Sequence, residues 1–410
     1  MAKKTCRFCD AQLEDVFIDL GMSPLANSFL KNENEFNDEK FFPLLVFVCN
    51  KCLLVQLQEF ESPEKIFRDY AYFSSFSDTW LKHSEEYSEL MIEKYRLTQD
   101  SLVIEIASND GYLLQFFKKK GIPILGIEPA ANVARSAEKK GIPTLVKFFG
   151  VETAQELFNK NQQADLITAN NVLAHVPNLN DFVKGLKILL KPKGVITIEF
   201  PHLLELIQQN QFDTIYHEHF SYFSFLTVQR IFTHHNLTIF DVEKLDTHGG
   251  SIRIFVKHPE NNELVINNRV EKLLEEERKF GLDKLSSYSN FSEKVKLIKK
   301  SLLEFLSIAK KQNKKIVGYG AAAKGNTLLN YCNIGQNYVD FVVDRSSHKQ
   351  DTFLPGTHIP VLNPEEIKKT KPDYILILPW NLREEIMGQL NFIREWGGKF
   401  VISIPEVKIY

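Results

Sequence analysis

The sequence predicts an α/β protein in which a doubly wound, mainly parallel sheet lies between a small cysteine-rich N-terminal domain and a second α/β unit. Two observations support this fold class. Short apolar runs alternate with amphipathic segments from about residue 100 to 260 and again after Lys314, which is the pattern of parallel strands covered by helices. Two C-x-x-C pairs lie in the first 65 residues, a segment too small to form much of a core without a staple.

The length and composition are those of a globular protein with more than one domain. We expect three domains in the 410 residues, at 1–65, 66–260 and 261–410. The net charge of −2 gives no basic surface for nucleic acid. No apolar run is long enough to span a membrane, and the start, MAKKTCRFCD, lacks the apolar core of a secretion signal. We therefore expect a cytoplasmic protein with no nucleic-acid or membrane partner, and the sequence indicates no oligomeric state.

The cysteines of the N-terminal segment have the spacing of a structural zinc site. Short strands are expected at FFPLLVFVC and LLVQLQ, with one C-x-x-C pair at Cys6 and Cys9 and another at Cys49 and Cys52. In a cytosolic chain such pairs indicate a metal rather than disulfides. Four thiolates fill the tetrahedral coordination of Zn²⁺ and leave no position for a substrate, so we predict a structural role. The alternative is a pair that is simply buried or redox-active.

The middle segment is expected to form the doubly wound sheet, which ends in an antiparallel pair. Its apolar runs predict strands at 101–107, 124–129, 144–150, 164–171 and 194–201, followed by two closely spaced strands at 237–245 and 251–258. Amphipathic segments predict helices at 111–121, 134–141, 151–161 and 180–191. Residues from about 260 to 312 are highly charged with a helical period, and we expect solvated helices that link two domains.

The loop after the first of these strands has the residues of a nucleoside-binding site. In VIEIASNDGYLL, Glu105 lies in the strand, and Asn109, Asp110 and Gly111 form the turn before the helix. Such a turn lies at the carboxyl edge of the sheet, where doubly wound folds bind ligands, and the helix N-terminus favours a carboxylate. Glu128 ends the next strand about twenty residues later, where an acidic side chain binds ribose hydroxyls.

The same loop distinguishes between two cofactors. A dinucleotide site would have glycines where this loop has Ala107 and Asn109. The acidic pair of Glu105 and Glu128 requires no phosphate, so S-adenosylmethionine is favoured over NAD. The alternative is an ordinary acidic turn with a surface glutamate.

Two further segments concentrate polar side chains after strands. ITANNVLAHVPN contains Asn170, Asn171 and His175 just after the fourth strand. The run DTIYHEHFSYFS contains Tyr216, His217, Glu218, His219 and Tyr222. Histidine is suited to proton transfer near neutral pH and an adjacent carboxylate can orient it, so this run predicts general-base chemistry. A catalytic metal is disfavoured because H-E-H lacks the i, i+4 spacing of the usual zinc-enzyme helix.

Taken together, these motifs resemble the sugar C-methyltransferases of deoxysugar pathways over essentially the whole chain. The similar segments are the two cysteine pairs, GMSPLANSFL, YAYFSSFSDTW, EIASNDGYLL, GIEP, NNVLAHV, YHEHFSYFS, HGGSIR and GYGAAAKGNTLLN. The resemblance implies a zinc-binding N-terminal domain, a class I methyltransferase domain that uses S-adenosylmethionine, and a Rossmann-like C-terminal domain. It also implies a dTDP-linked 4-keto sugar, bound between the last two domains and methylated at C-3, and a structural zinc held by Cys6, Cys9, Cys49 and Cys52.

The resemblance also implies roles for single residues. His219 is expected to be the base that removes the proton next to the ketone, with Glu218 beside it. The candidate donors to the developing oxyanion are Tyr216, His175 and either Tyr70 or Tyr72, of which we favour Tyr70. Asn170 and Asn171 are expected at the cofactor. The residues expected to contact the nucleotide-sugar substrate are Tyr72, Ser74, Ser75, His248, Arg253, Lys324 and Asn326.

The C-terminal segment carries the motif of the main alternative function. Strands are expected at 315–320, 338–344, 373–380 and 400–405, with a helix at 321–331. GYGAAAKG has the form G-x-G-x-x-A after a strand, and Asp344 ends the next strand, as in an NAD-dependent nucleotide-sugar oxidoreductase. Lys324 and Asn326 follow in the helix, whose N-terminus favours a diphosphate. Further alternatives are a scaffold unit without a ligand and a non-catalytic nucleotide-sugar-binding protein.

Overall fold

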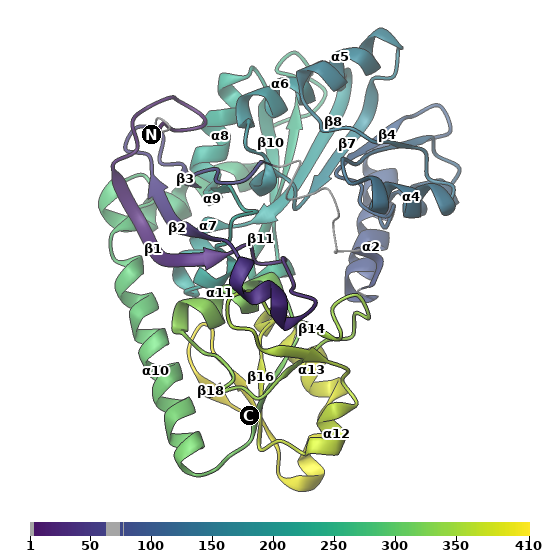
Figure 1. The fold of residues 1–410 in the computed structure, drawn as a ribbon. Coiled ribbons are helices and arrows are strands. Elements are labelled where there is room, and N and C mark those ends of the chain that lie inside the picture. The colour runs from purple at the N-terminus through teal and green to yellow at the C-terminus, as the bar shows by residue number, and fades with distance from the viewer. Residues whose placement is uncertain (1–3, 63–73, 77) are drawn as a thin grey trace.

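The computed structural model describes residues 4–62, 74–76 and 78–410 and arranges them around three sheets (Figure 1). The purple N-terminal sheet lies beside the teal middle domain, and the yellow-green C-terminal domain lies below both. Fully buried phenylalanines such as Phe17, Phe200 and Phe291 pack between the elements. None of the helices in the described part of the chain is both long and apolar enough to cross a bilayer.

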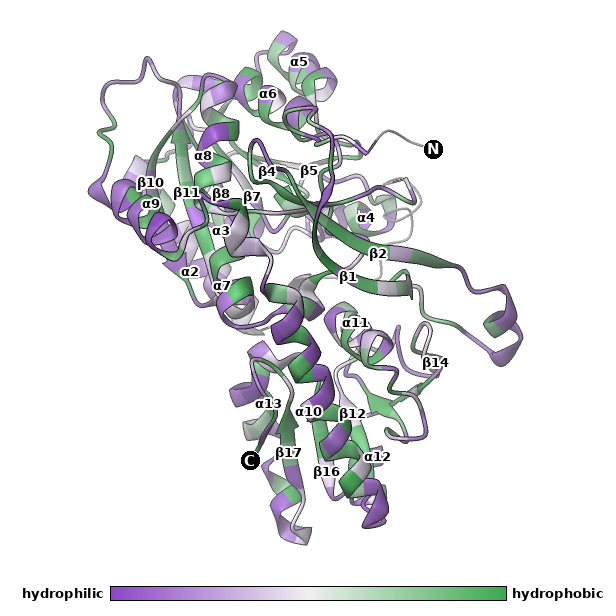
Figure 2. Cartoon of the chain, turned by 90° about the vertical axis from the view of Figure 1, so that its left-hand side faces the viewer, coloured by the Kyte–Doolittle hydropathy of each residue, from purple (hydrophilic) through white to green (hydrophobic). Residues whose placement is uncertain are grey.

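The N-terminal sheet has four antiparallel strands in the order β1-β2-β3-β9. Their bounds are Asp15–Pro24, Phe41–Val48, Val55–Leu57 and Ser221–Tyr222. The sequence predicts β2 and β3 but not β1, whose apolar pattern is broken by two register shifts against β2. Figure 2 shows β1 and β2 as long, mainly apolar strands that extend towards a polar tip. β9 belongs to the YHEHFSYFS run, so the N-terminal sheet includes a piece of the middle domain.

The middle sheet confirms the predicted doubly wound topology with an antiparallel end. Its order is β10-β11-β8-β7-β4-β5-β6, in which the last five strands are parallel and β10 and β11 form an antiparallel hairpin against β8. In chain order, β4 to β8 span Val103–Ile106, Ile124–Ile127, Thr144–Leu145, Ala164–Asn170 and Leu190–Pro201, and β10 and β11 span Thr238–Leu245 and Ser251–Lys257. The strand predicted at 144–150 is short because Val146 and Phe148 are exposed and do not join the core.

Helices cover both faces of the middle sheet. They are α2 (Asp78–Tyr95), α3 (Leu114–Lys119), α4 (Ala131–Lys139), α5 (Val151–Asn159), α6 (Leu179–Leu189), α7 (Leu203–Gln208) and α8 (Phe225–His234). Short 3-10 turns η1 to η8 span Glu33–Asp38, Ser74–Phe76, Leu173–His175, Phe212–Thr214, Thr247–Gly249, Leu285–Tyr288, Trp380–Leu382 and Asn391–Trp396. Several of these turns follow strand ends and carry the polar residues of the site.

The C-terminal domain has its own sheet, in the order β14-β15-β13-β12-β16-β17-β18. β12 to β18 span Ile316–Tyr319, Val342–Val343, Thr352–Phe353, Pro360–Leu362, Tyr374–Ile377, Lys399–Ile402 and Lys408–Ile409. The helices are α11 (Ala323–Cys332), α12 (Glu366–Thr370) and α13 (Arg383–Gln389). The predicted strands and the predicted helix of this segment are present, which confirms the Rossmann-like unit.

The two charged helices between these domains are more deeply packed than we expect from their composition. They are α9 (Asn268–Phe280) and α10 (Phe291–Lys311), and α10 runs down one side of the molecule (Figure 1). Phe291 of α10 stacks on Phe17 of β1, with ring centroids 4.8 Å apart. Glu277 of α9 is completely buried and accepts backbone N–H bonds from Phe225 and Leu226. These helices therefore connect two domains along the chain and also pack against all three domains.

Candidate active site

The loop after β4 is folded so that it surrounds a point at the carboxyl edge of the middle sheet. Ala107, Asn109 and Gly111 all have positive φ, at 55°, 49° and 76°. A Cβ on Gly111 would come within 2.8 Å of Ile142, so only glycine fits this turn. Glu128 accepts from the backbone N–H of Asn109 at 2.9 Å, and so ties the loops after β4 and β5 together. The sequence-predicted loop and acidic residue thus meet.

Three carboxylates are buried together at this point. Glu105 is 0% exposed, Asp110 1% and Glu128 5%. Burial holds the pKa of Glu105 well above its usual range, and the charges of Asp110 and Glu128 raise it further. Such a cluster is costly unless a positive charge compensates it. Lys140 pairs with Asp110, and the ammonium and sulfonium of S-adenosylmethionine would supply further positive charge when bound. Asn170 Oδ1, which has no hydrogen-bond partner among the described residues, adds a buried acceptor at the end of β7. The residues therefore fit this cofactor.

Two serines that are expected at the substrate contact the loop after β4. The backbone N–H of Ser74 donates to Asn109 Oδ1 at 2.9 Å, and the Ser75 hydroxyl donates to Asp110. Asp110 also pairs with Lys140 at 2.9 Å. η2 therefore packs on the loop after β4, and the expectation that both serines contact the substrate stays a prediction. Tyr70 and Tyr72 lie outside the described residues.

His219 is held in the orientation that a general base requires. Its Nδ1–H donates to the backbone carbonyl of Thr214 at 2.8 Å, which leaves the lone pair on Nε2. The half-buried ring packs against Tyr216, with centroids 4.0 Å apart, and against His175, with centroids 4.7 Å apart. Tyr222 is farther, at 6.2 Å. The structure thus brings the predicted His175, Tyr216 and His219 together from η3 and the YHEHFSYFS run.

The electrostatic environment keeps this imidazole neutral. Burial lowers the pKa of His219 well below its usual range, and His175, Lys324 and His248 lower it further. Burial also lowers the pKa values of His175 and His248, each to about 4. At neutral pH, His219 is therefore in the form that accepts a proton. Lys324 lies in α11 of the C-terminal domain and His248 in η5 of the middle domain. His219 and its neighbours therefore lie where these two domains meet.

Glu218 does not orient His219, which corrects the sequence-based expectation. Its side chain turns away, and both carboxylate oxygens accept from Asn27 Nδ2 at 2.8 Å. Glu218 is 4% exposed, and burial raises its pKa to about 7, although Asn27 and Lys349 lower it. Thr214, whose carbonyl orients His219, carries no sequence signal because any residue has a carbonyl.

The C-terminal domain contributes Lys324 to this region. Lys324 Nζ donates to Asn381 Oδ1 at 2.8 Å and lies 4.8 Å from the centre of the Trp380 ring. Trp380 Nε1 in turn donates to the buried Asp213 at 2.7 Å, and burial raises the pKa of Asp213 to about 6. Trp380 and Asn381 also line a cleft of about 380 Å³ between α7, the β10–β11 turn and η7. Asp213 begins the run DTIYHEHFSYFS but has no predicted role there, and the sequence motifs do not indicate Trp380 or Asn381.

Two other expected substrate ligands are used inside the protein. Asn326 is 2% exposed and donates to the backbone carbonyl of Ala26 at 2.6 Å, so it anchors the N-terminal domain. Arg253 is 3% exposed and pairs with Glu199 at 2.9 Å, with its guanidinium over the Tyr87 ring. Asn326 Oδ1 has no hydrogen-bond partner among the described residues, and the expectation that Asn326 and Arg253 bind the substrate stays a prediction. A buried arginine in a strand such as SIRIFVKH needs a carboxylate partner, and Glu199 on the neighbouring strand supplies it.

His248 has a strained backbone next to the site. Its φ of 55° and ψ of 18° are left-handed, a conformation that a residue other than glycine adopts at some cost. Thr247 fixes this turn by donating to Glu199 Oε1 at 2.8 Å. Its neighbour Gly249 packs so tightly that an added Cβ would lie 2.4 Å from Trp380. The turn therefore holds His248 near His219 at the contact between two domains.

The C-terminal glycine motif is used for packing. A Cβ on Gly320 would come within 2.6 Å of Pro379, and one on Gly318 within 2.7 Å of Val342. Asp344 accepts from the backbone N–H groups of Ala321 and Ser346, each at 2.8 Å. Both of its carboxylate oxygens thus have partners within the domain. The dinucleotide motif of an oxidoreductase is explained here by close packing of the sheet.

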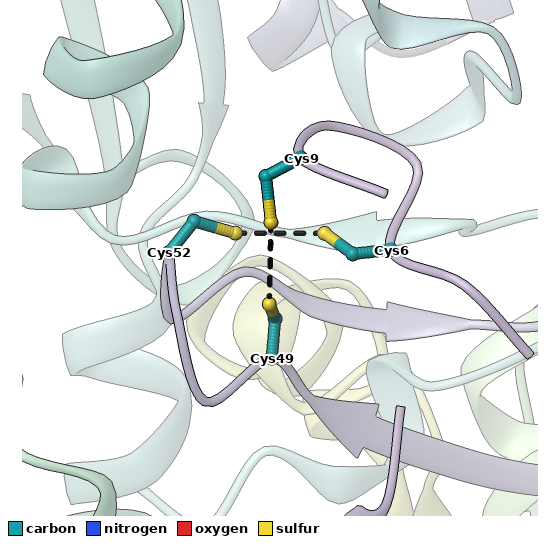
Figure 3. A group of neighbouring side chains, drawn as sticks. All are labelled: Cys6, Cys9, Cys49 and Cys52. Atoms are coloured by element: carbon teal, nitrogen blue, oxygen red, sulfur yellow. Dashed lines mark hydrogen bonds between the residues drawn. The ribbon is translucent and has the colours of Figure 1, made fainter. Parts of the chain in front are cut away.

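The four cysteines of the N-terminal domain form one cluster. Their sulfurs lie within 4.8 Å of one another and point to a common centre (Figure 3). The Cys6–Cys52 and Cys9–Cys49 sulfur pairs are each 3.5 Å apart. A tetrahedron with zinc–sulfur bonds of about 2.3 Å places its sulfurs about 3.8 Å apart, so this arrangement fits Zn²⁺. Cys6, Cys49 and Cys52 are buried, which suits a closed structural site.

Comparison with known proteins gives the same order of domains. Among solved structures, the PH0226 protein from Pyrococcus horikoshii OT3 is 16% identical to this chain, with a TM-score of 0.39. The match covers 48% of this chain and 99% of the PH0226 chain. Family models match as a zinc binding domain over residues 6–67, a methyltransferase domain over 83–242 and a C-methyltransferase C-terminal domain over 246–405. C-methyltransferase NovU from Streptomyces niveus is 34% identical over 404 residues, which are 98% of this chain and 96% of NovU.

Proposed function

Because this chain belongs to the C-methyltransferase family and is an S-adenosylmethionine-dependent enzyme, we propose that it methylates C-3 of a nucleotide-linked 4-keto-deoxysugar. The observation that carries the proposal is His219, a neutral imidazole with Nδ1 fixed by Thr214 and Nε2 left to accept a proton. Methyl transfer to oxygen needs less activation, whereas carbon must first be made nucleophilic. A correctly oriented base supports the transfer to carbon.

The reaction begins with proton removal from the carbon next to the ketone. His219 Nε2 takes the proton, the C–H electron pair forms the enolate, and negative charge develops on the ketone oxygen. When bound, S-adenosylmethionine supplies an electrophilic methyl group on sulfur. The enolate carbon forms the new C–C bond as the C–S bond breaks. His175 and Tyr216 lie against His219 and are the proposed donors to the oxyanion.

The nucleotide part of the substrate is proposed to lie against the C-terminal domain. Lys324 provides a positive charge near the catalytic cluster, and Asn381 holds it in place. The same Asn381 lines the cleft between α7 and η7, which has room for part of a nucleotide. A dTDP sugar fits this arrangement if its diphosphate meets Lys324 and its sugar reaches His219. Incubation with S-adenosylmethionine and a dTDP-4-keto-6-deoxysugar should yield a sugar nucleotide heavier by one methyl substituent in mass spectrometry, and no such product would refute the proposed substrate.

Replacing Glu105 by glutamine should weaken S-adenosylmethionine binding about 10–100-fold, since one charge-assisted contact is lost. The apo variant should melt no earlier than the wild type, because an uncompensated buried carboxylate is removed. Thermal unfolding with and without ligand measures both effects. Glu138→Gln, an exposed change on α4, is the control. NAD should stabilise neither protein, and a shift with NAD instead of S-adenosylmethionine would favour the oxidoreductase alternative.

Replacing Lys324 by methionine should raise the KM for the nucleotide sugar at least about tenfold, because a charge-assisted phosphate contact is lost. The affinity for S-adenosylmethionine should not change. Lys399→Met, at an exposed position in the same domain, should leave both constants unaltered. Steady-state kinetics with each substrate varied in turn checks this, and an unchanged KM for the sugar nucleotide would remove Lys324 from the proposed binding site.

A further inference from the structure

The N-terminal domain reaches directly into the segment that carries the proposed base. β3 pairs with β9, with Val55 opposite Tyr222, so strand pairing begins just after His219. The backbone N–H of Leu57 donates to the carbonyl of Phe220 at 3.0 Å. Arg7, one residue after the zinc ligand Cys6, donates to the carbonyl of Pro177 at 2.8 Å and lies over the Phe220 ring. The zinc-binding domain therefore contacts the chain at Phe220, next to His219, and at Pro177, close to His175.

A second contact from this domain involves the loop between β1 and β2. Asn27 donates to both oxygens of Glu218 at 2.8 Å. The loop itself is held by the C-terminal domain, since Ala26 accepts from Asn326 and Leu30 pairs with Phe353 through backbone hydrogen bonds of 3.0 and 2.8 Å. The β1–β2 loop thus connects the C-terminal domain, the N-terminal domain and the residue before the proposed base.

We infer that Asn27 is a positioning residue, whose side-chain amide holds Glu218 and thereby fixes the segment that presents His219 to the substrate. This inference rests on the proposed function of His219. A buried carboxyl needs a partner, and within the described part of the chain the donors or cations that face Glu218 are Asn27 and, at longer range, Lys349. His175, which packs on His219, also contacts the backbone of Glu218. A shift of Glu218 would therefore move both imidazoles.

Loss of the Asn27 amide should change catalysis rather than binding. Asn27→Ala should lower kcat about 10–100-fold, the range found for residues that hold metal ligands in place, with little change in either KM. Because the amide lowers the pKa of Glu218, its removal should shift the acidic limb of the kcat profile to higher pH. Ser28→Ala, an exposed change in the same loop, is the matched control and should behave as wild type.

A double-mutant cycle tests whether Asn27 acts through Glu218. Asn27→Ala combined with Glu218→Gln should lose no more kcat than Glu218→Gln alone, since residues in one network are not additive. Additive losses would overturn the inference.

Hydrogen exchange tests the same contact without any substrate. Peptides covering residues 212–223 should exchange faster in Asn27→Ala than in Ser28→Ala, with zinc content unchanged. Equal exchange would overturn the inference. Faster exchange in Asn27→Ala, in a protein whose wild type methylates no sugar nucleotide, would refute the proposed function and leave the Asn27 contact standing.

Discussion

Replacing His219 by asparagine should lower kcat about 10²–10⁴-fold, which is the usual contribution of a positioned general base. Asparagine retains a side-chain amide that can bond to the Thr214 carbonyl, but it cannot accept the proton from carbon. S-adenosylmethionine binding should be unchanged, because the three carboxylates that fit the cofactor lie in β4 and on the loops after β4 and β5. Single-turnover methyl transfer and thermal unfolding with the cofactor measure the two effects.

The matched control for this variant is His234→Asn. His234 is an exposed histidine at the end of α8, and its loss should leave kcat within about twofold of wild type, as expected for surface changes. Full activity in His219→Asn would remove this residue from the role of base. A Tm lowered equally with and without cofactor would instead indicate a structural effect, and would contradict the expectation of an intact fold.

Removal of zinc is expected to have the second large effect. Structural zinc sites in small domains contribute about 10–16 kcal/mol of apparent binding free energy. Because the site does not exist in the unfolded chain, this free energy stabilises the fold of the residues around the metal. Chelation, or Cys49→Ser, should therefore unfold the turns around the four sulfurs and lower the Tm. Because β3 continues from Cys52 and pairs with β9, the loss should also reduce methyl transfer.

Elemental analysis and thermal unfolding check the zinc prediction. The purified wild type should hold one zinc per chain and Cys49→Ser none. Cys332→Ala is the control, because Cys332 is buried in the C-terminal domain and its loss leaves the cluster intact. A protein that keeps its Tm and activity after complete removal of zinc would contradict the structural role of the metal.

The middle sheet could be predicted from sequence because its strands are local apolar runs between amphipathic helices. The pairing of β3 with β9 could not, since two residues such as Ser221 and Tyr222 give no periodic signal and their partners are distant in the chain. β14 and β18 were equally invisible, with two residues each. Sequence patterns identify elements that bury their own apolar face, whereas short edge strands depend on tertiary contacts.

The residues of the candidate site divide in the same way, into those with a local sequence signal and those that depend on tertiary contacts. Glu105, Glu128 and His219 could be identified because a carboxylate in an apolar strand or a histidine in a polar run needs a chemical reason. The partners of Arg253 and Asn326 inside the protein could not be predicted, since a motif shows the residue type but not the direction of the side chain. The partner of Glu218 proved to be Asn27, in another domain, which only the folded chain brings close.

The fate of the C-3 hydrogen tests the central claim most directly. A dTDP-4-keto-6-deoxysugar carrying deuterium at C-3 can be incubated with S-adenosylmethionine, and the product analysed by mass spectrometry and carbon NMR. The account predicts that wild type gives a product with the methyl group on C-3 and no deuterium there, and that His219→Asn gives almost none. A methylated product that keeps its deuterium, with the new methyl group on oxygen, would contradict the account.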